Sequence, residues 1–152
     1  MRLNGKDKKV ILLFCFLCCL LTSCGIGDWR YDKLPGDYEV WRINSYSIVL
    51  GRNKNGFSLD VVVGRFITEF CYNDSTIAIK KVEIDTETPY DTFDFDEVDW
   101  ADPDYYIIDA ENNLLYGPYT PQEFNRKLVE MGADDLGEWI KTEPAPSGAT
   151  YN

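Results

Sequence analysis

The stretch TIAIKKVEI at residues 76–84 is the clearest strand signal in the chain, and it decides the fold class. Its apolar residues recur at every second position, as in a strand that turns one face toward a core. The apolar phase changes between Ile79 and Val82. This change predicts a β-bulge near Lys80 and Lys81, which turns the following side chains toward the other face.

Strand patterns continue on both sides of this stretch. Residues 53–56, Asn-Lys-Asn-Gly, are a strong turn signal because Asn and Gly accept positive φ angles, and Gly64 predicts a bend or bulge. We therefore predict an α+β fold: mainly an antiparallel β-sheet of about six or seven strands, with one C-terminal α-helix packed on it. A small propeller-like or barrel-like closure is the alternative. The expected strands are 37–43, 46–50, 57–63, 65–71, 76–84, 104–109 and 113–116.

The C-terminal helix has both ends marked in the sequence. Thr120 can cap its first turn, and Glu123 completes a capping box. Phe124 and Leu128 lie one turn apart and predict the face that packs on the sheet. Gly132 is a natural C-cap, so the helix is expected to end there.

The first 23 residues have the form of an export signal. A basic head, with Arg2 and three lysines, precedes an unbroken apolar run from Val10 to Leu21. This run is too short to span a bilayer core, which needs about 20 apolar residues. It ends in Leu21-Thr22-Ser23-Cys24, which resembles the bacterial lipobox. The resemblance implies cleavage before Cys24, a diacylglycerol on its sulfur and an acylated new N-terminus.

These signals divide the chain into four parts. Residues 1–23 are the predicted lipoprotein signal peptide, and residues 24–36 a tether. Residues 37–140 are predicted to form a single globular α+β domain, since 129 mature residues are enough for one core but not for two comfortable ones. Residues 141–152 hold two prolines and small polar residues, which predicts a disordered tail.

The mature chain is strongly acidic. The leader carries four of the 15 basic residues and one of the 26 acidic ones, so 11 and 25 remain, a formal charge of −14. Such a surface repels nucleic acid and anionic lipid head groups, and it favours a basic protein partner or metal ions. The alternative is that the charge only keeps an exported domain soluble.

Residue types argue against an enzyme. Histidine is absent from the sequence, which excludes Ser-His and Cys-His nucleophile pairs and the usual zinc ligands. Once Cys24 is lipidated, Cys71 is the one remaining thiol of the mature chain, and its apolar surroundings predict a buried, inert group. We expect no cofactor apart from the covalent lipid.

An acidic stretch from Glu83 to Glu111 holds twelve acidic residues and no basic one. Its aromatic residues could anchor a basic protein partner that its carboxylates steer, as in an immunity or inhibitor protein. The same carboxylates are a type of ligand that calcium prefers, but their spacing does not match an EF-hand loop. The candidate partner-binding residues are Asp94, Asp96, Glu97, Asp99, Trp100, Tyr105 and Tyr106.

Two resemblances bear on function. Residues 105–124 resemble a bacterial GYF-like module, which implies aromatic contacts to a proline-rich peptide through Tyr105, Tyr106, Tyr116 and Tyr119. The mature chain as a whole is similar to small uncharacterised bacterial lipoproteins with a domain of unknown function. The segments that carry this second likeness are 36–44, 66–74 and 106–120. It implies no known activity.

We therefore expect a membrane-anchored lipoprotein of the cell envelope with a non-catalytic protein- or peptide-binding domain. The alternatives are an immunity or inhibitor protein against a basic partner, and a calcium- or small-ligand-binding lipoprotein. Gly25, rather than Asp, follows the lipidated cysteine. The usual sorting rule then places the protein in the outer membrane of a cell with two membranes.

Overall fold

The computed structural model describes residues 28–44, 47–56, 58–84 and 99–151. Within these ranges the chain is mostly β, with ten strands and one helix. Cys24 and the signal peptide lie outside the described residues, as do Asp94, Asp96 and Glu97.

The first sheet is built mainly from the N-terminal half of the chain. It is antiparallel, with the strand order β10-β1-β2-β3-β4. The residue Trp29 opens β1 and pairs with Arg42 of β2 and Tyr151 of β10, while Arg42 in turn pairs with Ile48 of β3. The strands are β1 (Trp29–Tyr31), β2 (Tyr38–Asn44), β3 (Ser47–Asn53), β4 (Leu59–Val63) and β10 (Thr150–Tyr151).

The second sheet follows in sequence and is also antiparallel. Its strand order is β8-β7-β6-β5-β9, so the short β9 covers the outer edge of β5. The strands are β5 (Ile67–Tyr72), β6 (Thr76–Lys81), β7 (Asp104–Asp109), β8 (Leu114–Tyr119) and β9 (Ile140–Lys141).

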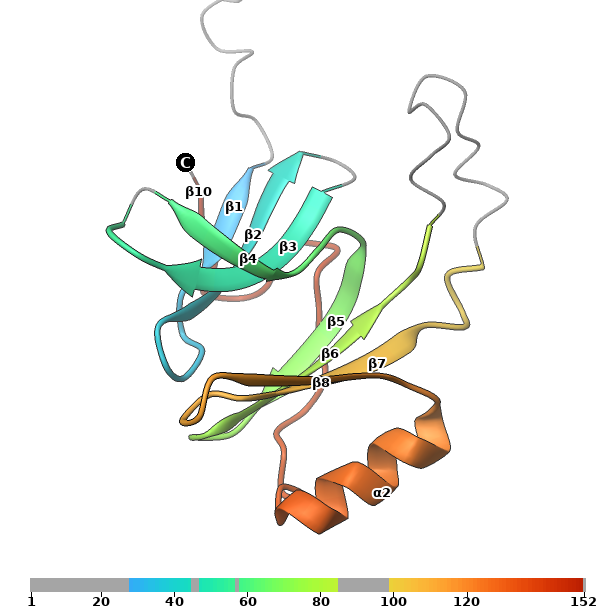
Figure 1. The fold of residues 1–152 in the computed structure, drawn as a ribbon. Coiled ribbons are helices and arrows are strands. Elements are labelled where there is room, and N and C mark those ends of the chain that lie inside the picture. The colour runs from blue at the N-terminus through green and yellow to red at the C-terminus, as the bar shows by residue number, and fades with distance from the viewer. Residues whose placement is uncertain (1–27, 45–46, 57, 85–98, 152) are drawn as a thin grey trace, which may run out of the picture.

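The elements form three layers: the first sheet, the second sheet and the helix α2 (Pro121–Met131) (Figure 1). The core between the sheets includes Val40 and Leu50 from the first sheet and Phe70 and Ile79 from the second. A second cluster lies between the other face of the second sheet and the helix, where Ala78 and Ile107 meet Phe124 and Leu128. The second sheet is therefore covered on both faces.

The prediction of one sheet with six or seven strands is wrong, because the strands divide into two five-stranded sheets. The division falls after β4, where Phe66 takes a left-handed φ of 70° and the chain passes to the second sheet. A strand shows the same period of two whichever sheet it joins, so alternation alone does not reveal the division. When two sheets face each other, each buries the apolar face of the other. A single 11-residue helix is too short to cover the apolar face of one large sheet.

Two predicted boundaries are also corrected. The tether assigned to residues 24–36 contains β1, whose Trp29 is fully buried. The segment 141–152, predicted to be a disordered tail, contributes to the edge strands β9 and β10. The strands in both segments are only two or three residues long, so they leave little periodic signal in the sequence.

The predicted bulge exists, but its extra residue lies in the neighbouring strand. Ile67 pairs with Lys81 and Glu69 with Lys80, so Thr68 of β5 is left unmatched opposite the two lysines. The pairing of β6 with β7 runs without interruption through both lysines. The change of apolar phase therefore predicted the position of the bulge correctly, at Lys80 and Lys81, but the extra residue belongs to β5 and not to β6.

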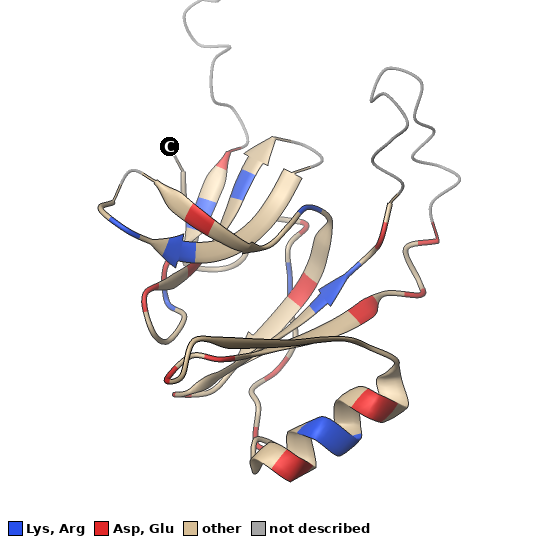
Figure 2. Ribbon diagram, in the orientation of Figure 1, with Lys and Arg blue, Asp and Glu red and all other residues tan. Residues whose placement is uncertain are grey.

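The helix ends are confirmed. The side chain of Thr120 accepts from the backbone N–H of Glu123, and the Glu123 carboxylate accepts from the Thr120 backbone N–H at 3.0 Å. Gly132 has a φ of 65°, and its N–H donates to the carbonyls of Leu128 and Val129. Figure 2 shows acidic residues on strands, connections and the helix, so the negative charge of the described residues is spread over many elements.

Candidate functional site

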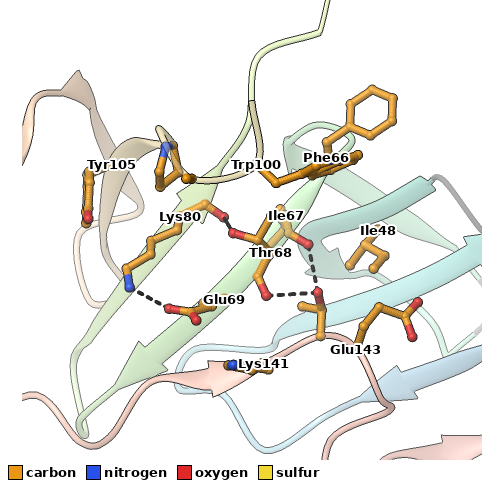
Figure 3. A pocket seen from close by; sticks show the side chains of 13 residues that line it. Ile48, Phe66, Ile67, Thr68, Glu69, Lys80, Trp100, Tyr105, Lys141 and Glu143 are labelled. Atoms are coloured by element: carbon orange, nitrogen blue, oxygen red, sulfur yellow. Dashed lines mark hydrogen bonds and ion pairs between the residues drawn. The ribbon is translucent and has the colours of Figure 1, made fainter. Parts of the chain in front are cut away.

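A cavity lies at the bulged end of β5 (Figure 3). Its volume of about 600 Å³ falls within the roughly 300–1,000 Å³ common for ligand pockets. Residues from both sheets, from the segment before β7 and from the C-terminal segment meet there. The lining residues are Ile48, Phe66, Ile67, Thr68, Glu69, Lys80, Trp100, Ala101, Pro103, Tyr105, Lys141, Thr142 and Glu143. We call it the β5 cavity.

Aromatic side chains form one wall of the β5 cavity. The rings of Phe66 and Trp100 meet edge to face, with 6.4 Å between their centroids. Phe66 is held by Val82, whose N–H donates to the Phe66 carbonyl at 3.1 Å, and by the small cluster of Phe66, Val82 and Ile84. Trp100 is 44% exposed. A half-exposed indole beside a buried phenyl ring is an apolar surface that a ligand could cover.

The floor of the β5 cavity is formed by β5 and by the C-terminal segment that bonds to it near the bulge. Because Thr68 is unmatched on the β6 side, its carbonyl is available to the C-terminal segment. The backbone N–H of Thr142 donates to this oxygen at 3.0 Å. The Thr142 hydroxyl is buried and lies 2.9 Å from the carbonyl oxygen of Ile67 and 3.0 Å from that of Thr68. These bonds hold residues 141–143 against the cavity.

The charges around the cavity are mostly paired. Lys80 donates to Glu69 at 2.5 Å, and its ammonium lies 4.2 Å from the ring centroid of Trp139. The Glu143 carboxylate lies 3.0 Å from the Arg42 guanidinium. Lys141 has no ion-pair partner among the described residues. The cavity therefore carries one cation that is not neutralised by a described neighbour.

The predicted partner-binding residues separate into three groups. Trp100 and Tyr105 both line the β5 cavity, and the exposed Asp99 precedes Trp100 on its rim. Tyr106 lies on the opposite face of β7, where it packs on the core between the sheets and donates to Glu83 at 3.1 Å. The remaining three are outside the described residues.

The four tyrosines of the GYF-like resemblance do not form one surface. Tyr105, Tyr116 and Tyr119 pack on the cluster beneath the helix, and Tyr106 packs on the other side of the sheet. Burial and its bond to Glu83 raise the pKa of Tyr106 to about 12. A groove on one face of the second sheet therefore cannot include all four tyrosines.

The sequence analysis missed the C-terminal wall of the cavity. Lys141, Thr142 and Glu143 fell in the segment predicted to be a tail, and Phe66 was assigned only to a strand. Ile140, Lys141 and Thr142 give only a weak strand signal, because Thr142, which is buried, is a polar residue. Nothing in the sequence indicated that it would bond to the β5 bulge.

The remaining features of the described residues do not indicate a reactive thiol, a metal site or a membrane-spanning helix. Burial raises the pKa of the Cys71 thiol to about 12, so the thiol is protonated at neutral pH. Within the described ranges, no group of three or more His, Cys, Asp or Glu residues is placed to hold a metal ion. The helix that is described there is too short and too polar to cross a membrane.

Comparison with known proteins gives one family match. A family described as "Protein of unknown function (DUF3997)" matches residues 35–136. The match extends from the residues before β2 to those after α2, so it leaves out β1, β9 and the C-terminal wall of the β5 cavity. No curated protein and no solved structure matches the chain.

Proposed function

The chain belongs to the DUF3997 family of proteins of unknown function, and we propose from its own residues that it is a lipid-anchored, non-catalytic binding domain of the bacterial cell envelope. Its ligand would occupy the β5 cavity. The observation that carries this proposal is the cavity itself, which combines a half-exposed Trp100 with Lys141, a cation that has no ion-pair partner in the described part of the chain.

The anchor rests on the lipobox-like residues Leu21-Thr22-Ser23-Cys24 and the basic, apolar leader before them. The fold is compatible with it, because β1 begins at Trp29, five residues after Cys24. Five residues span at most about 18 Å when fully extended. A lipid on Cys24 would hold the domain close to the membrane, on the outer membrane if the cell has two.

A non-catalytic role fits the chemistry of the cavity. Its two carboxylates, Glu69 and Glu143, each pair with a cation. The buried Cys71 is not among the lining residues. The cavity can hold and orient a ligand, and we assign it no bond-breaking step.

Asp99 and Asp102 support a second candidate. They are exposed on either side of Trp100 at the rim of the cavity. An exposed aromatic ring flanked by carboxylates is suited to a basic protein partner, as in an immunity or inhibitor protein. Salt should weaken such a complex far more than it weakens ligand binding in the cavity.

The anchor is tested by labelling cells with radioactive palmitate. The wild-type chain should incorporate the label and remain with the membranes, whereas Cys24→Ser should not incorporate it. Equal labelling of both chains would contradict the anchor.

The cavity is tested with the neutral dye N-phenyl-1-naphthylamine, whose fluorescence rises in apolar sites. Residues 25–152 contain all the described strands and the helix, so this chain without its lipid is a suitable sample. The dye should bind at one site, and Trp100→Ala should abolish binding. Val129→Ala is the matched control, because Val129 is an exposed apolar residue on the helix outside the cavity. Dye binding that is equal in all three proteins would contradict a ligand site at Trp100.

A further inference from the structure

The chemical class of the ligand can be inferred from the walls of the β5 cavity, if the proposed binding function is correct. The apolar lining residues of the cavity are Phe66, Trp100, Pro103, Ala101, Ile67 and Ile48. Figure 3 shows Phe66 and Trp100 together above the floor formed by β5, and Lys141 on the other side of the cavity. A ligand that fills this space would therefore present apolar groups to one wall and a polar group to the other.

The sign of the polar group follows from the charges. Glu69 and Lys80 neutralise each other, and so do Arg42 and Glu143. Lys141 is left without an ionic partner among the described residues, although its backbone pairs directly opposite Glu69. An anionic group beside Lys141 would gain an attractive partner without breaking either existing pair. A cationic group would meet Lys141 as a like charge.

The position of the cavity in the fold indicates where the ligand comes from. Trp29, Arg42 and Ile48 are paired in one row across β1, β2 and β3. Neighbouring strands are about 4.8 Å apart, so the start of β1 and the cavity wall at Ile48 are separated by roughly 10 Å. The end of the domain that follows the lipidated Cys24 is therefore also the end that holds the cavity.

Exposed apolar side chains gather at this end as well. Ile43 follows Arg42 and is 49% exposed, and Tyr151, which pairs with Trp29, is 68% exposed. Both are at the end of the first sheet from which the chain continues toward Cys24. Apolar and aromatic residues at this position are suited to the interface of a lipid bilayer.

From these observations we propose that the β5 cavity binds an amphiphile with an apolar chain and an anionic head, taken from the membrane surface beside the anchor. The chain would lie against Phe66 and Trp100, and the head would lie beside Lys141. The exposed Asp99 and Asp102 at the rim do not exclude such a head, because charges in water are screened over roughly 8–10 Å at physiological salt.

The test compares three amphiphiles that share a twelve-carbon chain and differ in the charge of the head: dodecanoate, dodecanol and dodecyltrimethylammonium. Each is used at pH 8, below its critical micelle concentration or, for dodecanol, below its solubility limit, to displace N-phenyl-1-naphthylamine from residues 25–152. Dodecanoate should bind about tenfold more tightly than dodecanol, as expected for one hydrogen bond to a charged group. The cationic amphiphile should bind most weakly.

Variants of Lys141 identify the source of the preference. Lys141→Met should remove the advantage of dodecanoate over dodecanol and leave dodecanol binding unchanged, and Lys141→Arg should keep the advantage. Asp99→Asn, which removes a rim charge, should leave the preference intact or increase it.

The outcomes are separable. Failure of the dye to bind would overturn the proposed binding function and this inference with it. Dye binding without displacement by any amphiphile, equal binding of dodecanoate and dodecanol, or preference for the cationic amphiphile would overturn this inference alone. A preference that is lost in Asp99→Asn and kept in Lys141→Met would also overturn it.

Discussion

The guanidinium of Arg42 and the carboxylate of Glu143 lie 3.0 Å apart and join β2 to the segment after β9. Glu143 also lines the β5 cavity. The C-terminal segment thus contacts the first sheet through an ion pair and the second sheet through Thr142. Because the Glu143 side chain is 55% exposed, we expect the ion pair to contribute less than about 1 kcal/mol to stability.

Thr142 should contribute more than the ion pair. It is 2% exposed, and its hydroxyl lies within hydrogen-bond distance of the carbonyl oxygens of Ile67 and Thr68. Thr142→Val keeps the shape and removes this donor, so it should lower the free energy of unfolding by about 1–3 kcal/mol in urea titrations. Thr142→Ser keeps the hydroxyl and is the control. Equal losses in both variants would show that the methyl group, rather than the hydroxyl, matters.

The capping box predicts a dependence of stability on pH. Hydrogen bonds from the backbone N–H and the hydroxyl of Thr120 lower the pKa of Glu123 below its ordinary value of 4.5. A carboxyl with a lowered pKa in the folded state stabilises the fold above its unfolded pKa, and this stabilisation is lost as pH falls through the folded value. Glu123→Gln should therefore be less stable than the wild type at pH 7, and the difference should shrink as the solution is acidified.

Glu130→Gln is the matched control, because Glu130 lies in the last turn of the same helix, where a negative charge is unfavourable. It should be as stable as the wild type or slightly more stable at pH 7. The free energy of unfolding of each protein would be measured from pH 7 to pH 3. If the difference between wild type and Glu123→Gln stays constant over this range, the prediction is contradicted.

Cys71 should be unreactive in the folded protein. It is 2% exposed, and burial raises its pKa to about 12, so almost no thiolate is present at pH 8. In residues 25–152, where Cys71 is the one cysteine, Ellman's reagent should label the thiol slowly in buffer and quickly in concentrated guanidinium chloride. Rapid labelling in buffer would show that the second sheet opens readily.

Calcium provides a test of the acidic stretch. Asp94, Asp96 and Glu97 lie outside the described residues, and their spacing does not match an EF-hand loop. We expect excess calcium to leave the melting temperature of residues 25–152 unchanged relative to excess EDTA. A clear increase that magnesium does not reproduce would establish a calcium site, since a ligand that binds only the folded state raises its stability.

Much of the local structure can be predicted from the sequence. Alternation located seven of the described strands, and the residues Thr120, Glu123 and Gly132 located the helix ends. These features depend on contacts between near neighbours in sequence, which periodicity and capping patterns describe well. The turn at Asn53–Gly56 is of the same kind, because the Asn53 side chain accepts from the backbone N–H groups of Asn55 and Gly56.

The division into two sheets and the cavity could not be predicted in this way. Both depend on pairings between distant residues, such as Thr142 with Ile67 and Thr68, and Trp29 with Tyr151. Strands of two or three residues show no period. Of the predicted site residues, the structure brings Trp100 and Tyr105 together and separates Tyr106, because successive residues of a strand point to opposite faces.

The most direct test of the account is to identify the small molecules that the full-length protein carries. The full-length chain would be purified from membranes in parallel with Lys141→Met, Trp100→Ala and the control Val129→Ala, and bound small molecules would be measured by mass spectrometry. The account predicts one class of anionic amphiphile in amounts close to that of the protein for wild type and Val129→Ala, and much less for the two cavity variants. The same lipid content in all four proteins, or no bound amphiphile in any of them, would contradict it.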